Sequence, residues 1–259
     1  MSDNGTRLRA VCFDLDGTLV ETEALKARSY AGAAVELRPD TLRESDVIAA
    51  YNDMVGRARE EVVAELMRRF ALEAPARARM AELGVASPEE VFAALRLRRY
   101  EAMLADRALV RGQAYPHALA LLHRVRGDGY ATGVATMSHA AQALVVLDIL
   151  GVRDELDAVV TRDEVERPKP DPEIYRLLVE RLHVPAAACL VIEDSLPGIR
   201  SALAAGTTCV AATTPMTHEQ VHAAGVLPPE RIVDDPERLE SVILTLLAER
   251  ARASAQRRA

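Results

Sequence analysis

The chain has 259 residues, of which 49% are hydrophobic, and its formal net charge is −7. This composition is typical of a folded globular protein, and the negative charge argues against a nucleic-acid partner, which would need a clustered basic surface. No apolar run approaches the roughly 18 residues of a membrane-spanning helix, and the first residues, MSDNGTRLRA, lack the apolar segment of a secretory signal, so we expect a cytoplasmic protein without a membrane partner.

Short runs of β-branched and apolar residues alternate with segments of helical periodicity along most of the chain. This alternation indicates β-α-β units and a mostly parallel sheet covered on both faces, which right-handed crossovers arrange as a Rossmann-like, doubly wound α/β fold. The expected strands are Leu8–Phe13, Ala131–Thr136, Ala158–Thr161, Cys189–Ile192, Thr208–Ala211 and Arg231–Val233. The accompanying helices are expected over 117–127, 139–150, 172–183, 197–204 and 236–249, and the residues from Ala251 onward are expected to fray.

One long interval, from about Thr22 to about Gln113, contains no convincing strand. Ninety residues are too many for a structureless loop in a compact domain, so we expect a small helical cap domain inserted after the first strand. The expected division is a catalytic core of residues 1–20 and 113–259 and a cap of residues 21–112. Helices are expected over 23–37, 41–53, 58–70 and 88–105, broken by Pro39, Pro75 and Pro88.

The stretch VCFDLDGTLVE places two carboxylates, Asp14 and Asp16, at the end of the first strand, followed by Gly17. Ligands of α/β sheets bind beyond the carboxyl ends of the strands, and residues two apart in extended backbone face the same side. Two adjacent anions need a compensating cation, and Mg²⁺ prefers carboxylate and phosphate oxygens. The pattern therefore indicates a metal-assisted phosphoryl site with one Asp as nucleophile and the other as proton carrier, although D-G-T is also common turn chemistry.

Further polar residues follow later strands in chain order. In GVATMS the hydroxyl of Thr136 and the next backbone N–H, that of Met137, could hold a phosphate oxygen. In RPKPDP two prolines restrict the backbone around Lys169, and CLVIED ends in Glu193 and Asp194, which suit a metal. Each has an ordinary structural alternative, such as a strand end, a solvated turn or a helix cap, but their ordered appearance favours one site.

These motifs together resemble the haloacid dehalogenase superfamily, in particular its phosphatases and β-phosphoglucomutase-like members with an inserted α-helical cap. The resemblance covers nearly the whole chain. The matching segments are DLDGT at Asp14–Thr18, Thr136, KPDP from Lys169, and EDSLPGIRSALAAG from Glu193 to Gly206.

The resemblance implies a role for each carboxylate. Asp14 would attack phosphorus and form an aspartyl-phosphate, while Asp16 would protonate the leaving oxygen and then deprotonate the hydrolytic water. The implied cofactor is Mg²⁺, held by the Asp14 carboxylate, the Asp16 main-chain carbonyl and Asp194, with Glu193 nearby in support.

The phosphoryl oxygens would be bound by Thr136 and Lys169. In the family pattern, the metal-free dehalogenases lack an acid at the position of Asp16, and phosphonoacetaldehyde hydrolases have a small residue there. The acid at Asp16 therefore distinguishes this chain from both classes. A degenerate, non-enzymatic member is a competing hypothesis, which predicts loss of at least one catalytic residue, but all are present.

Substrate choice should lie with the cap. Its candidate contacts are Glu23 and Lys26 on the first expected cap helix, and Gly56, Arg57 and Arg59 in the loop VGRARE; the alternative is that these charges are simply solvated. Arg59 falls where β-phosphoglucomutases carry a phosphate-gripping arginine, but Lys26 stands where those mutases have a histidine. We therefore expect a phosphatase for a small phosphorylated metabolite, a sugar phosphate or similar, with a phosphosugar mutase as the alternative. A monomer or weak homodimer is expected.

The segment HEQVH, His218 to His222, fits the H-E-x-x-H pattern of zinc proteases. Zinc would need both histidines on one face of a stable helix and a third ligand. The helix expected here is short, between Pro215 and Gly225, and no histidine follows at a suitable spacing, so we do not favour a metalloprotease.

Overall fold

The computed structural model describes residues 6–55, 57 and 59–257. The chain divides into two compact units, which we call the sheet unit, Met1–Glu21 with Gln113–Ala259, and the helical unit, Thr22–Gly112. The two connections meet within the sheet unit, where Val20 bridges Ala114 and the Glu21 N–H donates to the Gln113 carbonyl at 2.7 Å. The helical unit is therefore an insertion whose two ends leave the sheet unit side by side.

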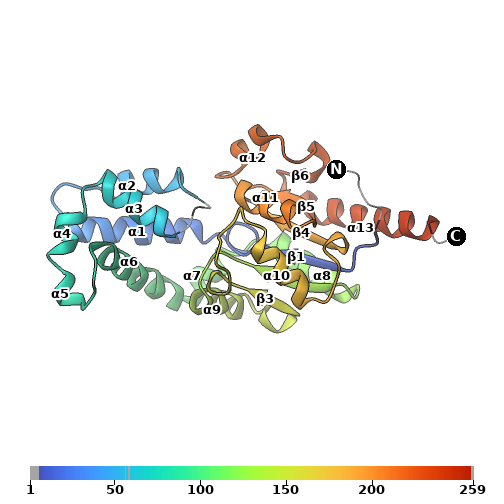
Figure 1. Ribbon diagram of the computed structural model, residues 1–259, viewed down its shortest axis with the longest axis horizontal. Coiled ribbons are helices and arrows are strands. Elements are labelled where there is room, and N and C mark those ends of the chain that lie inside the picture. The colour runs from blue at the N-terminus through green and yellow to red at the C-terminus, as the bar shows by residue number, and fades with distance from the viewer. Residues whose placement is uncertain (1–5, 56, 58, 258–259) are drawn as a thin grey trace. The chain divides into compact units, whose positions relative to one another are not determined.

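The sheet has six strands, all paired in parallel, in the order β3-β2-β1-β4-β5-β6 (Figure 1). This order confirms the predicted doubly wound α/β fold. The strands run outward from β1 in both directions, β2 and β3 on one side and β4 to β6 on the other, so the carboxyl end of β1 is the topological switch point. The strands are β1 (Ala10–Phe13), β2 (Ala131–Ala135), β3 (Ala158–Val160), β4 (Cys189–Glu193), β5 (Thr208–Ala212) and β6 (Ile232–Val233).

Helices follow the strands in turn and cover the sheet. One face of the sheet carries α10 and α11, which contact each other and share an apolar core with alternate residues of β1, β4 and β5. The helix α8 packs against β2 and against α13. The α-helices of the sheet unit are α8 (Pro116–Gly127), α9 (Ala140–Leu150), α10 (Glu173–Arg181), α11 (Leu196–Ala204), α12 (His218–Ala224) and α13 (Leu239–Gln256).

The helical unit has its own apolar core. Tyr30 stacks on Tyr51 with ring centroids 5.3 Å apart and also contacts Phe92, and the buried guanidinium of Arg96 lies between the rings of Tyr30 and Tyr100 at 4.7 and 4.8 Å. Its helices are α1 (Glu23–Leu37), α2 (Glu44–Asn52), α3 (Arg59–Arg69), α4 (Glu73–Arg77), α5 (Met80–Leu83), α6 (Pro88–Ala105) and α7 (Arg107–Arg111).

The structure differs from the sequence-based expectations at Pro75 and at the C-terminal helix. Pro75 lies inside the short helix α4 instead of breaking a helix, because proline is tolerated in a first turn. The C-terminal helix continues to Gln256, where fraying was expected from Ala251. The buried Arg250 explains the extension, since its Nη2 donates to the Thr208 Oγ1 on β5 at 3.1 Å and ties the last turns to the sheet. Among the described residues, no helix is both long and apolar enough to span a membrane.

Candidate active site

Asp14 extends the ladder of β1, and a sharp turn follows it. The Asp14 N–H donates to the Ile192 carbonyl of β4 at 2.9 Å. The chain then turns at Gly17, whose φ is +95°, a left-handed conformation that favours glycine. A Cβ at Gly17 would lie 2.4 Å from Asp194 Oδ2, so glycine is also what allows the Asp194 carboxylate to approach this turn.

A buried lysine joins two of the carboxylates. Lys169 Nζ donates to Asp14 Oδ1 at 2.6 Å, to Glu193 Oε1 at 2.6 Å and to the Ala135 carbonyl at the end of β2 at 3.1 Å. The side chains of Lys169, Asp14 and Glu193 are at most 8% exposed. An ammonium has three protons, so these contacts use all of them and fix the lysine in one place.

Glu193 is held from several sides by groups that the sequence analysis gave no role. Its Oε1 also accepts from the Tyr175 hydroxyl at 2.7 Å, and its Oε2 accepts from the Ser195 hydroxyl at 3.1 Å. A Cβ at Gly198 would lie 2.0 Å from the carboxylate. Ser195 and Gly198 stand in the quoted EDSLPG segment and could have been noticed there, whereas nothing around Tyr175 in the sequence signals its contact.

Asp16 has a different environment from Asp14, half-buried and next to hydroxyl groups. Its Oδ2 accepts from Ser138 Oγ at 2.6 Å and from Thr136 Oγ1 at 3.2 Å, and the Ser138 N–H donates to Thr136 Oγ1 at 3.0 Å. Ser138 lies in the GVATMS segment but was not predicted as a site residue. Met137, between them, packs its side chain against the core of the sheet.

The electrostatics of the site follow from burial and from the crowded carboxylates. Burial raises the pKa of Asp14 to about 8; Lys169 opposes this shift, and the negative charges of Glu193 and Asp16 add to it. For Lys169, burial disfavours the charged form, but Asp14 and Glu193 outweigh it and raise the lysine pKa above its ordinary value. Lys169 is therefore a permanent cation in this site.

The donor set fits a hard divalent cation. Asp14, Glu193 and Asp194 each offer one carboxylate oxygen, and these atoms lie within 4.8 Å of one another. Opposite ligands of an octahedral Mg²⁺ are about 4.2 Å apart and adjacent ligands about 2.9 Å, so the carboxylate oxygens are gathered on the scale of one coordination shell. Together with Asp16 the site holds four carboxylates and one ammonium, Lys169, and buried like charges at this density need further positive charge.

Three substrate contacts predicted from the sequence, Glu23, Lys26 and Arg59, belong to the helical unit. Glu23 is buried, and its carboxylate accepts from Lys26 Nζ at 2.7 Å and from the Tyr51 hydroxyl at 2.5 Å. Arg59 is the first residue of α3. Its positive charge acts on Tyr30 of the same unit: burial raises the pKa of Tyr30, and the charge of Arg59 is among those that oppose this shift. Gly56, in the same predicted loop, lies outside the described residues.

Known proteins share both the sequence and the fold. The chain is 34% identical over 223 residues to phosphoglycolate phosphatase of Rhodospirillum rubrum, and the match covers 85% of each chain. It is 30% identical over 219 residues to validoxylamine A 7'-phosphate phosphatase of Streptomyces hygroscopicus subsp. limoneus, covering 85% of this chain and 92% of the other. The crystal structure of β-phosphoglucomutase from Clostridium difficile superposes with a TM-score of 0.72 over 96% of this chain and 99% of the other; its 19% identity shows the fold alone.

Residues 8–206 match the family described as haloacid dehalogenase-like hydrolase. This match includes every acidic, hydroxyl and lysine side chain of the site in the sheet unit. The chain therefore belongs to the haloacid dehalogenase-like hydrolases and is a phosphatase of that family.

Proposed function

We propose that this phosphatase hydrolyses a small phosphorylated metabolite with Mg²⁺ and through an aspartyl-phosphate intermediate. The observation that carries the proposal is the pairing of Asp14 with Lys169 inside a carboxylate cluster, with Asp16 held separately by hydroxyl groups. One carboxylate is thus oriented for attack, while the other keeps a polar, half-buried setting suited to proton transfer.

In the proposed reaction, the free oxygen of Asp14 attacks phosphorus, and the bond between phosphorus and the ester oxygen breaks. Asp16 donates its proton to the departing oxygen, so an alcohol leaves. Asp16 then takes a proton from water as that water attacks the aspartyl-phosphate, which returns Asp14 and releases inorganic phosphate. The hydrogen bond from Ser138 to Asp16 supports this role because it fixes the position of one carboxylate oxygen.

The residues that would hold Mg²⁺ are Asp14, Asp194 and the Asp16 main-chain carbonyl. The ion would supply positive charge against the developing negative charge of the phosphoryl oxygens. Glu193 has both oxygens engaged with protein donors, and we assign it chiefly to positioning Lys169.

Lys169 and Thr136, with the Met137 N–H, are the proposed contacts of the phosphoryl group. Lys169 supplies a buried charge that a phosphate can share with Asp14, and such preorganised contacts are strongest where water is excluded. Removing one of them should reduce the rate by about 10²- to 10³-fold.

The helical unit is the proposed cap, with Glu23, Lys26 and Arg59 as its candidate contacts for the leaving group. Such a cap would exclude water and select the substrate. Because the relative from Rhodospirillum rubrum is a phosphoglycolate phosphatase, 2-phosphoglycolate and sugar phosphates are the first substrates to compare. A Lys26→Ala variant should change the Michaelis constant or the substrate ranking more than it changes folding.

The proposal is tested by phosphate release from a panel of phosphorylated metabolites with and without Mg²⁺. Asp14→Asn should abolish release, and it should abolish hydroxylamine-sensitive labelling of acid-quenched protein by a radiolabelled substrate. Asp128→Asn is the matched control, since Asp128 is an exposed carboxylate of the sheet unit that pairs with Arg124. Parental turnover in Asp14→Asn contradicts the proposal. If the enzyme moves the phosphate of β-glucose 1-phosphate to another position on the sugar and releases no inorganic phosphate, it is a mutase instead.

A further inference from the structure

A second group of candidate metal ligands lies on the surface of the sheet unit, within the HEQVH segment and beyond it. His218 and His222 are one turn apart on α12, and their ring centroids are 4.5 Å apart. Both are exposed, with 53% and 43% of their side-chain surface accessible. The two imidazoles therefore share one face of the helix, as two metal-binding histidines at this spacing must.

A third side chain reaches the pair from the neighbouring edge of the sheet. Asp234 follows β6 directly, and its oxygens lie 3.0 and 3.1 Å from His222 Nε2, while Oδ2 lies 3.7 Å from His218 Nε2. One ligand atom from each of the three residues fits within a span of 4.8 Å. Adjacent ligands of a tetrahedral Zn²⁺ are about 3.3 to 3.5 Å apart, so the observed separations are close to those of a coordination shell.

Asp234 is itself oriented by a second hydrogen bond. Thr213, the residue after β5, donates its hydroxyl to Asp234 Oδ1 at 2.7 Å, and the Thr213 N–H donates to the Val233 carbonyl at 3.0 Å. Protein hydrogen bonds that fix a ligating carboxylate are typical of metal sites.

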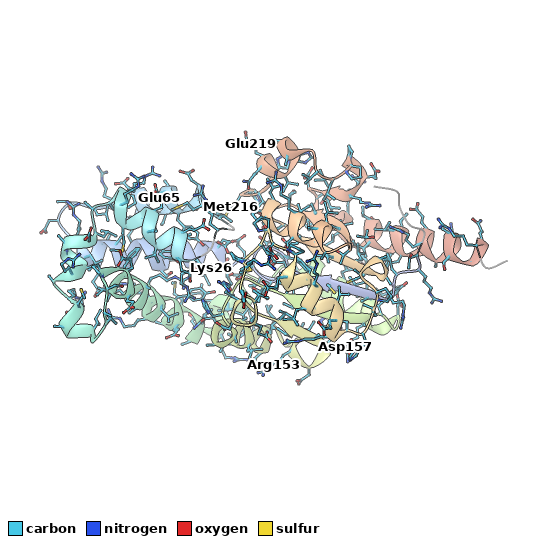
Figure 2. The ribbon with its side chains drawn as sticks, in the orientation of Figure 1. Lys26, Glu65, Arg153, Asp157, Met216 and Glu219 are labelled. Atoms are coloured by element: carbon cyan, nitrogen blue, oxygen red, sulfur yellow. The ribbon has the colours of Figure 1, made fainter. Side chains whose placement is uncertain are left out.

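We propose that His218, His222 and Asp234 bind a divalent transition-metal ion such as Zn²⁺, with water completing the coordination. The two imidazoles distinguish this site from the all-oxygen set at Asp14, because nitrogen ligands favour Zn²⁺, Co²⁺ and Ni²⁺ over Mg²⁺. The proposal concerns metal binding and not peptide hydrolysis. Figure 2 shows Glu219, the acidic residue of the pattern, at the outer surface of the short helix α12.

No third histidine follows the HEQVH segment at a suitable spacing in the sequence. The third ligand is instead an aspartate, brought near by the pairing of β5 with β6. The competing explanation is that His222 and His218 simply form ion pairs with Asp234, at 3.0 and 3.7 Å. That explanation predicts no metal binding.

Isothermal titration of the full chain with Zn²⁺, in excess Mg²⁺ that occupies the oxygen site, tests the proposal. We expect one equivalent of Zn²⁺ to bind the parent, with loss of binding in His222→Gln and weakening of at least about 10-fold in His218→Gln. Co²⁺ should give the visible absorption of a tetrahedral site in the parent and not in His222→Gln. His123→Gln is the matched control, because His123 makes a comparable pair with Glu155 at 2.7 Å but has a single imidazole, and it should bind Zn²⁺ as the parent does.

Two results would overturn the proposal: no Zn²⁺ bound by the folded parent, or equal binding by the parent and His222→Gln. Circular dichroism establishes that each variant is folded. Phosphate release in Mg²⁺ alone should be unchanged in His218→Gln and His222→Gln, so the outcome here is independent of the proposed function.

Discussion

Replacing Gly198 with alanine tests whether the position of Glu193 controls the site. Gly198 lies in the first turn of α11, and a Cβ there would be 2.0 Å from the Glu193 carboxylate. Contacts of a Cβ below 3.0 Å are essentially unobserved, so the two groups must separate by about 1 Å. Glu193 is fully buried, and its displacement must therefore disturb the groups that it binds.

The cost can be worked from these contacts. Overpacking of a tight interior costs about 1–3 kcal/mol, and weakened hydrogen bonds from Lys169 and Tyr175 to the displaced carboxylate add about 1–3 kcal/mol. We expect a loss of about 2–6 kcal/mol in the free energy of unfolding. Because Lys169 also binds Asp14, a shift of this size should reduce the turnover number by about 100-fold.

Gly127→Ala is the matched control, since Gly127 ends α8 and a Cβ there meets nothing within 4 Å. This variant should keep parental activity and gain up to about 1 kcal/mol from the better helix propensity of alanine. Urea denaturation measures both stabilities, and Mg²⁺-dependent phosphate release measures both activities. If Gly198→Ala matches Gly127→Ala in stability and turnover, the reasoning about Glu193 is refuted.

Three further predictions concern hydrogen bonding and protonation. Tyr175→Phe should lower turnover by about 10- to 100-fold and stability by about 1–3 kcal/mol, because buried Glu193 loses a hydrogen bond. At pH 7, Mg²⁺ binding should release about one proton per chain, since the pKa of Asp14 is about 8 in the metal-free protein; calorimetry in buffers of different ionisation enthalpy measures this release. Glu36→Gln should destabilise the protein by about 1–2 kcal/mol at pH 7, and its difference from the parent in urea denaturation should shrink below pH 4.

The sign of the last effect follows from the surroundings of Glu36. Although burial opposes the shift, hydrogen bonds from Arg79 and Arg99 lower the pKa of Glu36 from 4.5 to about 2. A depressed pKa contributes stability above the unfolded value, and that contribution is lost as pH falls through about 2. Glu65→Gln is its control, because Glu65, labelled in Figure 2, has a more exposed side chain than Glu36 and forms its ion pair with Arg68, one turn away on the same helix; an equal loss in both variants would contradict the assignment.

Controls for the other two predictions use the same assays. Tyr115→Phe removes a comparable hydroxyl-to-carboxylate bond, to half-buried Glu21 at 2.5 Å, and should cost less stability than Tyr175→Phe. Parental turnover in Tyr175→Phe would contradict its positioning role. Proton release that persists unchanged at pH 9.5, where Asp14 is already ionised, would contradict the assignment of that proton.

The sequence contains the order of the strands and motifs because both depend on local pattern. Buried parallel strands read as short apolar runs, and all six expected strands occur within two residues of their predicted bounds. Since parallel strands end at the same edge of a sheet, residues that directly follow them, such as Asp14 and Thr136, can be expected near one another from the sequence alone.

Contacts that depend on which elements become neighbours could not be read in this way. Tyr175 reaches Glu193 because α10 packs on the sheet next to α11, the helix that follows β4, and Asp234 reaches His222 because β6 pairs with β5. Neither pairing has a fixed spacing in the sequence. The short helices α4, α5 and α7 were missed for a related reason, since four or five residues carry too little periodicity to be recognised.

The hydrogen bonds around Lys169 explain how a cluster of buried carboxylates can exist at all. All three lysine protons and both oxygens of Glu193 have partners among protein groups, so the Lys169–Glu193 pair is fully hydrogen-bonded within the protein. Asp14 is the carboxylate that remains, and its burial, together with the negative charges of Glu193 and Asp16 and against the charge of Lys169, raises its pKa to about 8, so that it retains a proton at neutral pH. A protonated carboxyl is a poor nucleophile, so any cation that displaces this proton would also activate Asp14. Under the proposed mechanism, metal binding and activation of the nucleophile are therefore one electrostatic event.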